Sequence, residues 1–225
     1  EKIIIRDNKL IFNNSNNNFF GIHNQRLIIS NGFNNQDIYY SDLKNSWKIF
    51  KNALPKNIKK VASISTEKGF FCIGSIDSET IKTFLIQYIN KEIIIDWEIP
   101  SPSFELLKPQ LIEFNNDIFI LVNNSIDSTT DLWKLDLSSN KWEKIQSFKF
   151  KSNKNLLLTS QSDGTKKHFF FLGGERLDEN YKFDLKLNKL TSISSPTLDY
   201  NINSFNSKIF SIGTNHLIIF HKNKH

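Results

Sequence analysis

The stretch DLWKLDLSSNKWEKI, residues 131–145, decides the fold of this chain. Apolar and polar residues alternate over most of residues 132–136, which is the pattern of a half-buried β-strand. Residues 138–140 (SSN) then form a polar break of the kind that closes a hairpin, and Trp142 opens a second short apolar strand. The stretch therefore predicts a β-hairpin with an aspartate, Asp136, at the end of its first strand.

The hairpin pattern recurs elsewhere in the chain. Residues 180–190 (NYKFDLKLNKL) match it with Tyr181 in place of Trp133 and Asp184 in place of Asp136. Residues 37–47 (DIYYSDLKNSW) match it with one residue fewer in the turn. Two further copies of one hairpin predict a repeat protein rather than a single isolated motif.

A similar apolar strand occurs five times in the chain, and three of these strands precede a copy of the hairpin. Residues 168–174 (HFFFLGG) show it most clearly, because the strand ends in a Gly pair, and the counterparts lie at residues 26–32, 70–74, 117–123 and 208–213. Successive copies fall roughly 40 to 50 residues apart, which is the period of propeller blades.

The combination resembles the kelch repeat, in which an aromatic residue, an Asp at the strand end and a Trp about six residues later recur in every blade. The repeats are degenerate, since only residues 173–174 keep both glycines. The resemblance to the kelch and galactose-oxidase-like propeller superfamily implies an all-β fold, a β-propeller of four-stranded antiparallel blades. It covers nearly the whole chain, and residues 1–225 are expected to form a single kelch-like domain. Because the sequence contains no Met, we expect it to belong to a longer or processed chain.

The expected strands fill about five blades. Blade one takes residues 19–22, 26–30, 38–41 and 47–50; blade two begins at residue 60 and takes residues 70–74, 82–88 and 93–99; blade three takes residues 111–114, 118–122, 132–135 and 142–145; blade four takes residues 156–160, 168–172, 181–183 and 190–193; and blade five takes residues 202–205, 208–212 and 216–220.

Blade five lacks a fourth strand in this assignment. Residues 1–6 and 9–12 are strand-like and precede blade one. An N-terminal strand that completes the last blade would remove the exposed edges of an open sheet. We therefore expect residues 3–5 or 10–12 to pair with residues 216–220.

The conspicuous side chains have structural roles in this scheme. We expect Trp47, Trp97 and Trp142 to pack blades together, and Asp42, Asp136 and Asp184 to cap their own turns. The single cysteine, Cys72, lies in an apolar strand and is expected to be a buried, inert thiol. No nucleophile elbow, zinc-ligand spacing or dinucleotide fingerprint occurs, so we expect neither catalysis nor a metal or cofactor.

Loops on a rigid scaffold are where binding residues concentrate. In an antiparallel blade with strands a to d, the b–c and d–a connections lie at one end, and here they are the longer set. We expect the binding surface there, with Arg176 as the strongest candidate because acids flank it and Arg is enriched among binding hot spots. The candidate partner-binding residues are Asn34, Gln36, Asp127, Lys151, Glu175 and Arg176.

Charge and composition bear on the partner and the compartment. The net charge is +6 and the pI about 9.2, and lysines cluster at residues 48–60 and 149–154. A positive rim would attract an acidic protein, RNA or an anionic membrane; the alternative is a lysine-rich surface without a role. No apolar run is long enough to span a membrane and no signal peptide is evident, and the lack of disulfides favours a cytoplasmic location.

These features predict a non-catalytic protein–protein interaction module or scaffold that binds its partner through the b–c and d–a loops. The alternative is a carbohydrate-binding or glycosidase-type five-bladed propeller. A glycosidase would need two carboxylates about 5 to 10 Å apart, and the sequence shows no pattern that brings two together.

Overall fold

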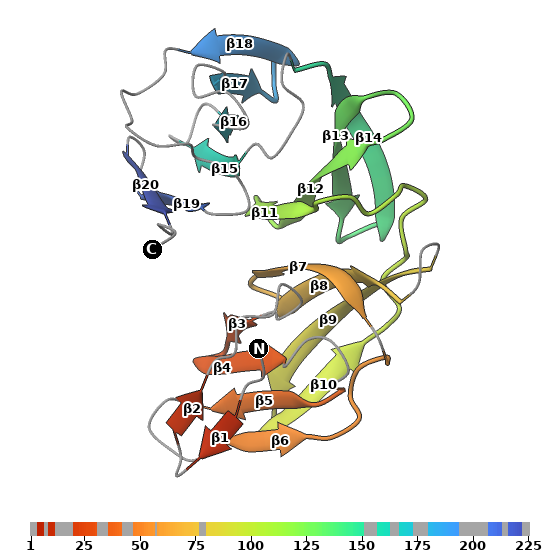
Figure 1. The fold of residues 1–225 in the computed structure, drawn as a ribbon, viewed down its shortest axis with the longest axis vertical. Coiled ribbons are helices and arrows are strands. Elements are labelled where there is room, and N and C mark those ends of the chain that lie inside the picture. Colours follow the sequence, from red (N-terminus) through yellow and green to blue (C-terminus); the bar gives the residue numbers. More distant parts are fainter. Residues whose placement is uncertain are drawn as a thin grey trace. The chain divides into compact units, whose positions relative to one another are not determined.

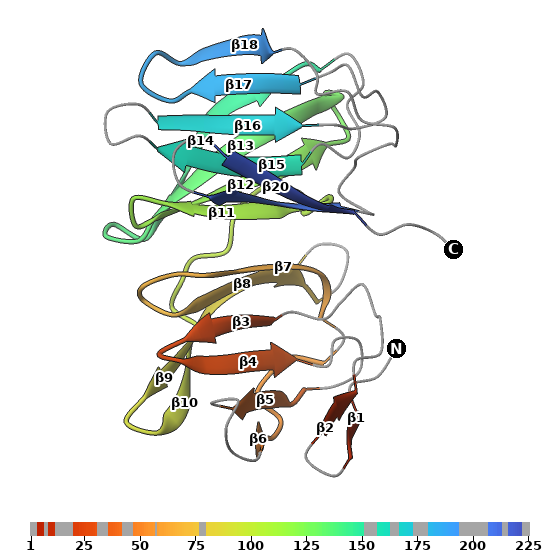
Figure 2. The ribbon, with the colours of Figure 1, turned by 90° about the vertical axis from the view of Figure 1, so that its left-hand side faces the viewer.

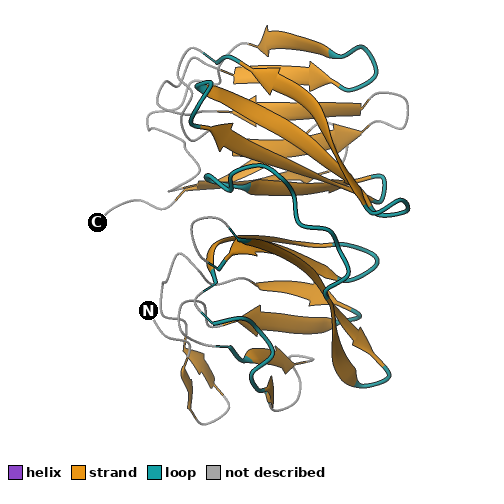
Figure 3. Cartoon of the chain, turned by 90° about the vertical axis from the view of Figure 1, so that its right-hand side faces the viewer, coloured by secondary structure: helices purple, strands orange, loops and turns teal. Residues whose placement is uncertain are grey.

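The computed structural model describes residues 4–6, 9–11, 20–30, 36–41, 47–56, 58–76, 80–150, 157–162, 167–172, 180–193, 207–212 and 216–221. Every regular element within these ranges is a β-strand (Figure 3). The described part of the chain accordingly has no helix able to cross a membrane. The all-β prediction is confirmed.

Four sheets of four strands follow one another along the chain, each with its strands in sequence order (Figure 1). We call them blades one to four. Blade one contains β3 (Phe20–His23), β4 (Arg26–Ser30), β5 (Ile38–Ser41) and β6 (Lys48–Phe50); blade two contains β7 (Lys59–Ser65), β8 (Phe70–Ser75), β9 (Ile81–Ile89) and β10 (Glu92–Asp96). Blade three contains β11 (Gln110–Phe114), β12 (Asp117–Asn124), β13 (Thr129–Asp136) and β14 (Lys141–Phe148); blade four contains β15 (Leu157–Ser162), β16 (Lys167–Leu172), β17 (Asn180–Asp184) and β18 (Lys189–Ile193). The sheets are antiparallel, as predicted for propeller blades.

Among the described residues, two further sheets have two strands each. At the N-terminal end, β1 (Ile4–Arg6) pairs with β2 (Lys9–Ile11), and near the C-terminal end β19 (Ser207–Ile212) pairs with β20 (His216–His221). The expected pairing of an N-terminal strand with residues 216–220 is wrong for these strands. A hairpin with two connecting residues costs far less loop-closure entropy than a pairing across most of the chain.

The first strands of successive blades lie side by side: β3 beside β7 and β7 beside β11. The strand β19 lies beside β15 in the same manner. Residues 208–212 therefore take the place of a first strand, whereas the sequence pattern assigned them to the second. The segment expected to be that first strand, residues 202–205, lies outside the described residues.

Asparagine residues form the tight turns of the blades. Both central residues have positive φ in three two-residue turns, which are Asn24-Gln25, Asn90-Lys91 and Asn115-Asn116. Turns of this kind match the right-handed twist of a hairpin, and Asn tolerates positive φ better than most residues do. In the longer turns of blades three and four, Asn140 and Asn188 take the same left-handed conformation. Seven of the eleven described non-glycine residues with positive φ are Asn.

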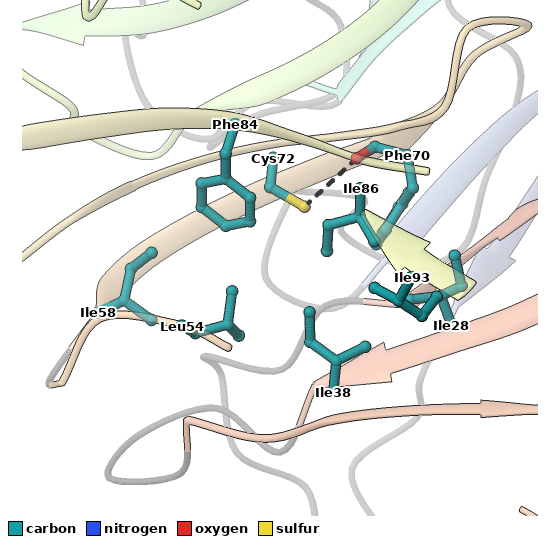
Figure 4. Packing of buried hydrophobic residues seen from close by; sticks show 9 residues of the cluster. All are labelled: Ile28, Ile38, Leu54, Ile58, Phe70, Cys72, Phe84, Ile86 and Ile93. Carbon is teal, nitrogen blue, oxygen red and sulfur yellow. Dashed lines mark hydrogen bonds between the residues drawn. The ribbon is translucent and has the colours of Figure 1, made fainter. Parts of the chain in front are cut away.

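Blades one and two share one hydrophobic core (Figure 4). Ile28 and Ile38 of blade one pack with Phe70, Cys72, Phe84, Ile86 and Ile93 of blade two, and Leu54 and Ile58 of the intervening connection complete the cluster. Cys72 is fully buried, and burial raises the pKa of its thiol well above the usual value. Cys72 is thus the buried thiol that its strand pattern predicts.

A close backbone approach joins these two blades. A Cβ atom on Gly21 would lie 2.0 Å from Cε2 of Phe70, whose ring is fully buried. Only a residue without a side chain fits between β3 and this ring.

An aromatic cluster forms the core of blade four. Phe148 lies 5.1 Å from both Phe171 and Phe183, measured between ring centroids, and Phe150 lies 4.9 Å from Tyr181. Phe148 and Phe150 come from the end of β14 and the residues that follow it. Aromatic packing therefore ties the connection after blade three to blade four.

The tryptophans are less buried than the repeat pattern predicts. Trp97 keeps 42% of its surface exposed and packs on one side against Phe84, at 4.7 Å between centroids. Trp142 is half-buried; its Nε1 donates to the carbonyl oxygen of Pro100 at 2.8 Å, and its ring meets Phe104 edge-on at 5.5 Å. These two rings therefore hold the connection after blade two in place. The hairpin pattern alone does not predict this role.

The chain divides into two compact units, residues 1–118 with 134–143 and residues 119–133 with 144–225. Figure 2 shows the four strands of blade four, β15 to β18, side by side. The expectation of a single domain stays a prediction.

Candidate functional site

Two of the six predicted partner-binding residues, Gln36 and Asp127, lie among the described residues. Gln36 belongs to blade one and bonds to the connection that leaves this blade, whereas Asp127 makes its hydrogen bonds within blade three. The other four lie outside the described residues: Asn34, Lys151, Glu175 and Arg176.

Gln36 ties together two loops of blade one. Its side-chain Nε2 donates to the carbonyl oxygen of Leu54 at 2.8 Å, and its own carbonyl oxygen accepts from the Leu54 N–H at 2.9 Å. Leu54 is buried in the core of blades one and two. Gln36 therefore joins the b–c loop of its blade to the connection that leaves the blade, and its amide is engaged within the protein.

Asp127 belongs to a loop that one asparagine organises. The side-chain Oδ1 of Asn124 accepts from the N–H groups of Ile126 and Asp127 at 3.1 and 3.2 Å, which is an Asx turn. The Nδ2 of Asn124 donates to Oδ2 of Asp127 at 3.1 Å. The b–c loop of blade three is therefore fixed by its own hydrogen bonds.

The loop is anchored on a buried carboxylate. The same Nδ2 of Asn124 donates to Oδ2 of Asp131 at 3.2 Å, and Thr129 Oγ1 donates to the other carboxylate oxygen at 3.0 Å. Lys144 Nζ, on the neighbouring strand β14, lies 2.7 Å from Asp131 Oδ2 and also 5.7 Å from the ring centroid of Trp133. We call residues 124–131 together with Lys144 the blade-three corner.

These contacts keep Asp131 ionised. Burial alone would raise the pKa of Asp131, but the hydrogen bonds donated to its carboxylate, with that of Lys144 the strongest, outweigh burial and hold the pKa below its usual value. Asp127 and Asp131 are two carboxylates held by one amide nitrogen, an arrangement the sequence did not reveal. A glycosidase needs a general acid with a raised pKa, so the state of Asp131 does not fit that role.

Ile126 projects from the blade-three corner. Its side chain is 90% exposed, the highest value among the exposed large hydrophobic residues of the described chain. It stands between Ser125 and Asp127, whose backbone is held by the Asn124 turn. The corner therefore presents an apolar side chain on a preorganised polar loop.

Sequence reasoning found Asp127 but missed the residues that hold it. Asp131 is a charged residue inside the described strand β13 and is buried with 3% exposure. A buried charged side chain in a strand needs hydrogen-bonding or oppositely charged partners. This requirement was the signal from which the sequence could have indicated the network around Asp131. Its partner Lys144 lies on the next strand, where the sequence does not distinguish it from other surface lysines.

A second polar cluster joins blades one and two at their a–b and c–d turns. The Tyr88 N–H donates to Nδ1 of His23 at 2.9 Å, and Asn24 Nδ2 donates to the Tyr88 carbonyl oxygen at 2.9 Å. His23 is buried, and burial lowers the pKa of its imidazole despite a hydrogen bond with the backbone of Glu67. We call His23, Asn24, Arg26, Tyr40, Tyr88 and Glu92 the turn seam.

The turn seam combines aromatic rings with planar polar groups. The guanidinium carbon of Arg26 lies 4.9 Å from the ring centroid of Tyr88, and Tyr40 lies 5.7 Å from the same ring. The pKa of the Tyr40 hydroxyl is raised, first by burial and then by the neighbouring Tyr88 and Glu92. These four residues come from β4, β5, β9 and β10. Their spacing in the sequence does not indicate that they lie close together.

The turn aspartates have the capping role predicted for them. Asp136 Oδ1 accepts from the Ser138 N–H at 2.7 Å, and Asp184 Oδ1 accepts from the N–H groups of Lys186 and Leu187, each at 2.9 Å. Hydrogen bonds from Ser138 hold the pKa of Asp136 well below its usual range. Asp42 lies outside the described residues. Among the described residues, no three His, Cys, Asp or Glu side chains come together as metal ligands.

The comparisons with known proteins define the fold and leave the family open. No protein-family model matches the chain, and no curated protein sequence matches it. Among solved structures, the chain is similar to YjhT, with 12% identity and a TM-score of 0.56, over 84% of this chain and 68% of the other. It is also similar to the SapL1 lectin in complex with alpha methyl fucoside, with 11% identity and a TM-score of 0.55, over 92% of this chain and 72% of that one. The fold is that of a multi-blade β-propeller.

Proposed function

We propose that this chain is a non-catalytic, kelch-like binding module that recognises a protein partner through the b–c and d–a loops of its blades. A propeller fold supports many functions, so the proposal rests on the loops rather than on the fold. The candidate contact residues are Ile126 and Asp127 of the blade-three corner, with Asn34, Lys151, Glu175 and Arg176 on loops of the same kind.

The observation that carries the proposal is the setting of Ile126. An exposed apolar side chain on a mobile loop would lose conformational entropy on binding, whereas the Asn124 turn and the Asp131 anchor already hold this one. Preorganisation of that kind reduces the cost of association. Protein interfaces also commonly have apolar residues at the centre of the contact patch and polar groups at its rim.

The test begins with co-purification from the native source, which identifies a partner, followed by affinity measurements on two variants. Ile126→Ser and Leu187→Ser both remove an exposed apolar side chain, since Leu187 is 67% exposed on the c–d turn of blade four. We expect Ile126→Ser to weaken partner binding by about 2 kcal/mol or more, roughly 30-fold. The matched Leu187→Ser variant should bind like the wild type.

Arg176→Ala and Lys186→Ala extend the same comparison to blade four. We expect Arg176→Ala to weaken binding and Lys186→Ala, on the opposite turn, to leave it unchanged, with the thermal stability of both variants preserved. If Leu187→Ser and Lys186→Ala weaken binding while Ile126→Ser and Arg176→Ala do not, the binding surface is at the other end of the blades.

A second candidate function is carbohydrate binding, and the turn seam favours it. The seam places the Tyr88 ring beside the guanidinium of Arg26 and the ring of Tyr40, and the charge of Glu92 acts on the Tyr40 hydroxyl, at the junction of two blades. Sugar sites pair an aromatic surface with a few well-placed polar groups. The similarity to a lectin solved with alpha methyl fucoside supports the same idea at the level of the fold.

Titration calorimetry with alpha methyl fucoside, followed by a panel of other glycans, tests this candidate. Saturable binding that is lost in Arg26→Ala and retained in Ile126→Ser would establish carbohydrate binding at the turn seam. This result would favour the second candidate function over the protein-partner proposal. Absence of binding to every glycan would remove the second candidate.

A further inference from the structure

The outer strand of blade one differs from the outer strands of the other described blades. All three residues of β6, Lys48, Ile49 and Phe50, are exposed, and Ile49 and Phe50 keep 48% and 40% of their surface in solvent. Alternate residues of a strand point to opposite faces. The strand therefore presents a large apolar side chain on each face.

The other outer strands expose mainly polar residues. On β14 the exposed residues are Lys141, Glu143, Lys144 and Ser147, and on β18 they are Lys189, Thr191 and Ser192. On β10, Ile94 is exposed, but Glu92 beside it is exposed as well. Adjacent exposed apolar residues without an accompanying acid are thus a property of β6 among these four strands.

Among the described residues, β6 pairs with no strand except β5. It is the last strand in the order β3-β4-β5-β6, and it pairs with β5 through the partners Ile38↔Phe50, Tyr39↔Ile49 and Tyr40↔Lys48. An outermost strand carries a row of backbone donors and acceptors on its free side, which can add another strand. The backbone of β6 therefore offers hydrogen bonds, and its side chains offer apolar contacts.

The charge around β6 selects the kind of strand that can be added. Residues 47–56 (WKIFKNALPK) contain three lysines and no acid, and Lys48, Lys51 and Lys56 are all exposed. A second copy of this chain would bring the same positive charge to the edge, and like charges across a strand pair are unfavourable. Lysines on an edge strand thus oppose self-pairing while favouring an acidic segment.

We propose that β6 is a docking edge for an extended acidic segment of a protein partner, in which acidic residues alternate with apolar ones. The segment adds as a fifth strand to blade one, its apolar residues contact Ile49 or Phe50, and its carboxylates meet Lys48 and Lys51. This site is separate from the loop surface proposed above and does not depend on it. An RNA strand would use the lysines but neither the apolar side chains nor the regular backbone edge.

Binding of defined peptides tests the proposal. The probe is an N-acetylated, C-amidated seven-residue peptide in which glutamate alternates with valine; the comparison peptide has lysine in place of glutamate. We expect the acidic peptide to bind at least tenfold more tightly at low salt, and to slow amide hydrogen exchange at residues 48–50. The double variant Lys48→Glu/Lys51→Glu should reverse the preference between the two peptides.

Matched variants separate the edge from general surface charge. Phe50→Ser should weaken binding of the acidic peptide several-fold, and Ile94→Ser on the outer strand of blade two should not. The proposal is overturned if both peptides bind equally, if neither binds, or if exchange slows elsewhere and not at β6. It is also overturned if oligouridylate binds as tightly as the acidic peptide and is lost in the Lys48→Glu/Lys51→Glu variant, since the site would then recognise phosphate.

Discussion

Asp131 is a charged residue at a buried position of β13, where an apolar residue would need no hydrogen-bonding partner. Its carboxylate is buried and accepts hydrogen bonds from the side chains of Asn124, Thr129 and Lys144. Replacing one member of such a network leaves the others without their partner, and that loss is usually larger than the net value of the interaction. Asp131 therefore contributes both to the stability of blade three and to the conformation of the loop that carries Ile126.

Asp131→Asn should lower the free energy of unfolding at pH 7 by about 1 to 3 kcal/mol. The loss is smaller than that for a wholly buried ion pair, because Lys144 remains 37% exposed. The folded-state pKa of Asp131 lies below the unfolded value of about 3.9. Its contribution is therefore complete above that value and is lost as the pH falls through the folded pKa.

Denaturant unfolding of wild type and Asp131→Asn between about pH 2 and 7 measures this effect. The difference between the two proteins should shrink as the pH falls below about 4. Asp127→Asn, which alters an exposed carboxylate of the same corner, is the control. A difference between wild type and Asp131→Asn that stays constant with pH would contradict the assigned role of the carboxylate.

Gly21 is required by the fully buried ring of Phe70. Gly21→Ala places a Cβ atom 2.0 Å from Cε2 of that ring, which cannot move away without disturbing the shared core. Overpacking of this kind typically costs about 1 to 3 kcal/mol. Thermal or denaturant unfolding should show the loss, whereas Ile22→Ala at the adjacent, 56% exposed position should stay within about 0.5 kcal/mol of the wild type.

At the scale of elements, the connection from blade two to blade three is held by Trp142. The ring contacts Phe104, and its Nε1 donates to the Pro100 carbonyl oxygen. Burial of this ring is partial, so we expect Trp142→Ala to cost about 2 to 3 kcal/mol, less than the 3 to 5 kcal/mol of a fully buried aromatic side chain.

Trp142→Phe separates the two contacts. It keeps an aromatic ring near Phe104 but removes the hydrogen bond, which should cost about 0.5 to 1.5 kcal/mol. Limited proteolysis should reveal faster cleavage within residues 97–109 in both variants, more so in Trp142→Ala. Unchanged cleavage together with a loss of stability would show that Trp142 stabilises blade three and not the connection.

At the scale of the whole molecule, neighbouring blades are stabilised together where they share a core. The core of blades one and two contains the single cysteine of the chain, so its thiol reports the opening of both blades. Ile28, on β4, is fully buried in that core and belongs to the other blade. Removal of the Ile28 side chain should therefore increase the rate at which the Cys72 thiol becomes accessible to reagents.

Ile28→Ala should destabilise the core by about 2 to 5 kcal/mol. Because the thiol reacts only in the open state, its labelling by a thiol reagent should accelerate roughly tenfold for each 1.4 kcal/mol lost. The control is Ile94→Ala, an exposed residue of blade two, which should label at nearly the wild-type rate. Equal labelling rates in Ile28→Ala and wild type would mean that blade two opens without blade one.

The sequence by itself determined the repeat and the strands. The alternation of apolar residues, the aspartates that precede the turns and the polar breaks between strands all act within a few residues, so the strands of blades one to four could be placed close to where they lie. The buried thiol and the turn-capping role of Asp136 and Asp184 follow from the same local patterns.

Only the tertiary structure decided which side chains meet across the sheets. The exposure of Trp97, the anchoring of Asn124 on Asp131 and the contact of Arg26 with Tyr88 were not evident from the sequence. Each depends on how segments far apart in the chain, or on neighbouring strands, pack against one another. Strand periodicity fixes which face of a sheet a residue occupies, but the partner it finds there is set by competition among contacts that no local pattern encodes.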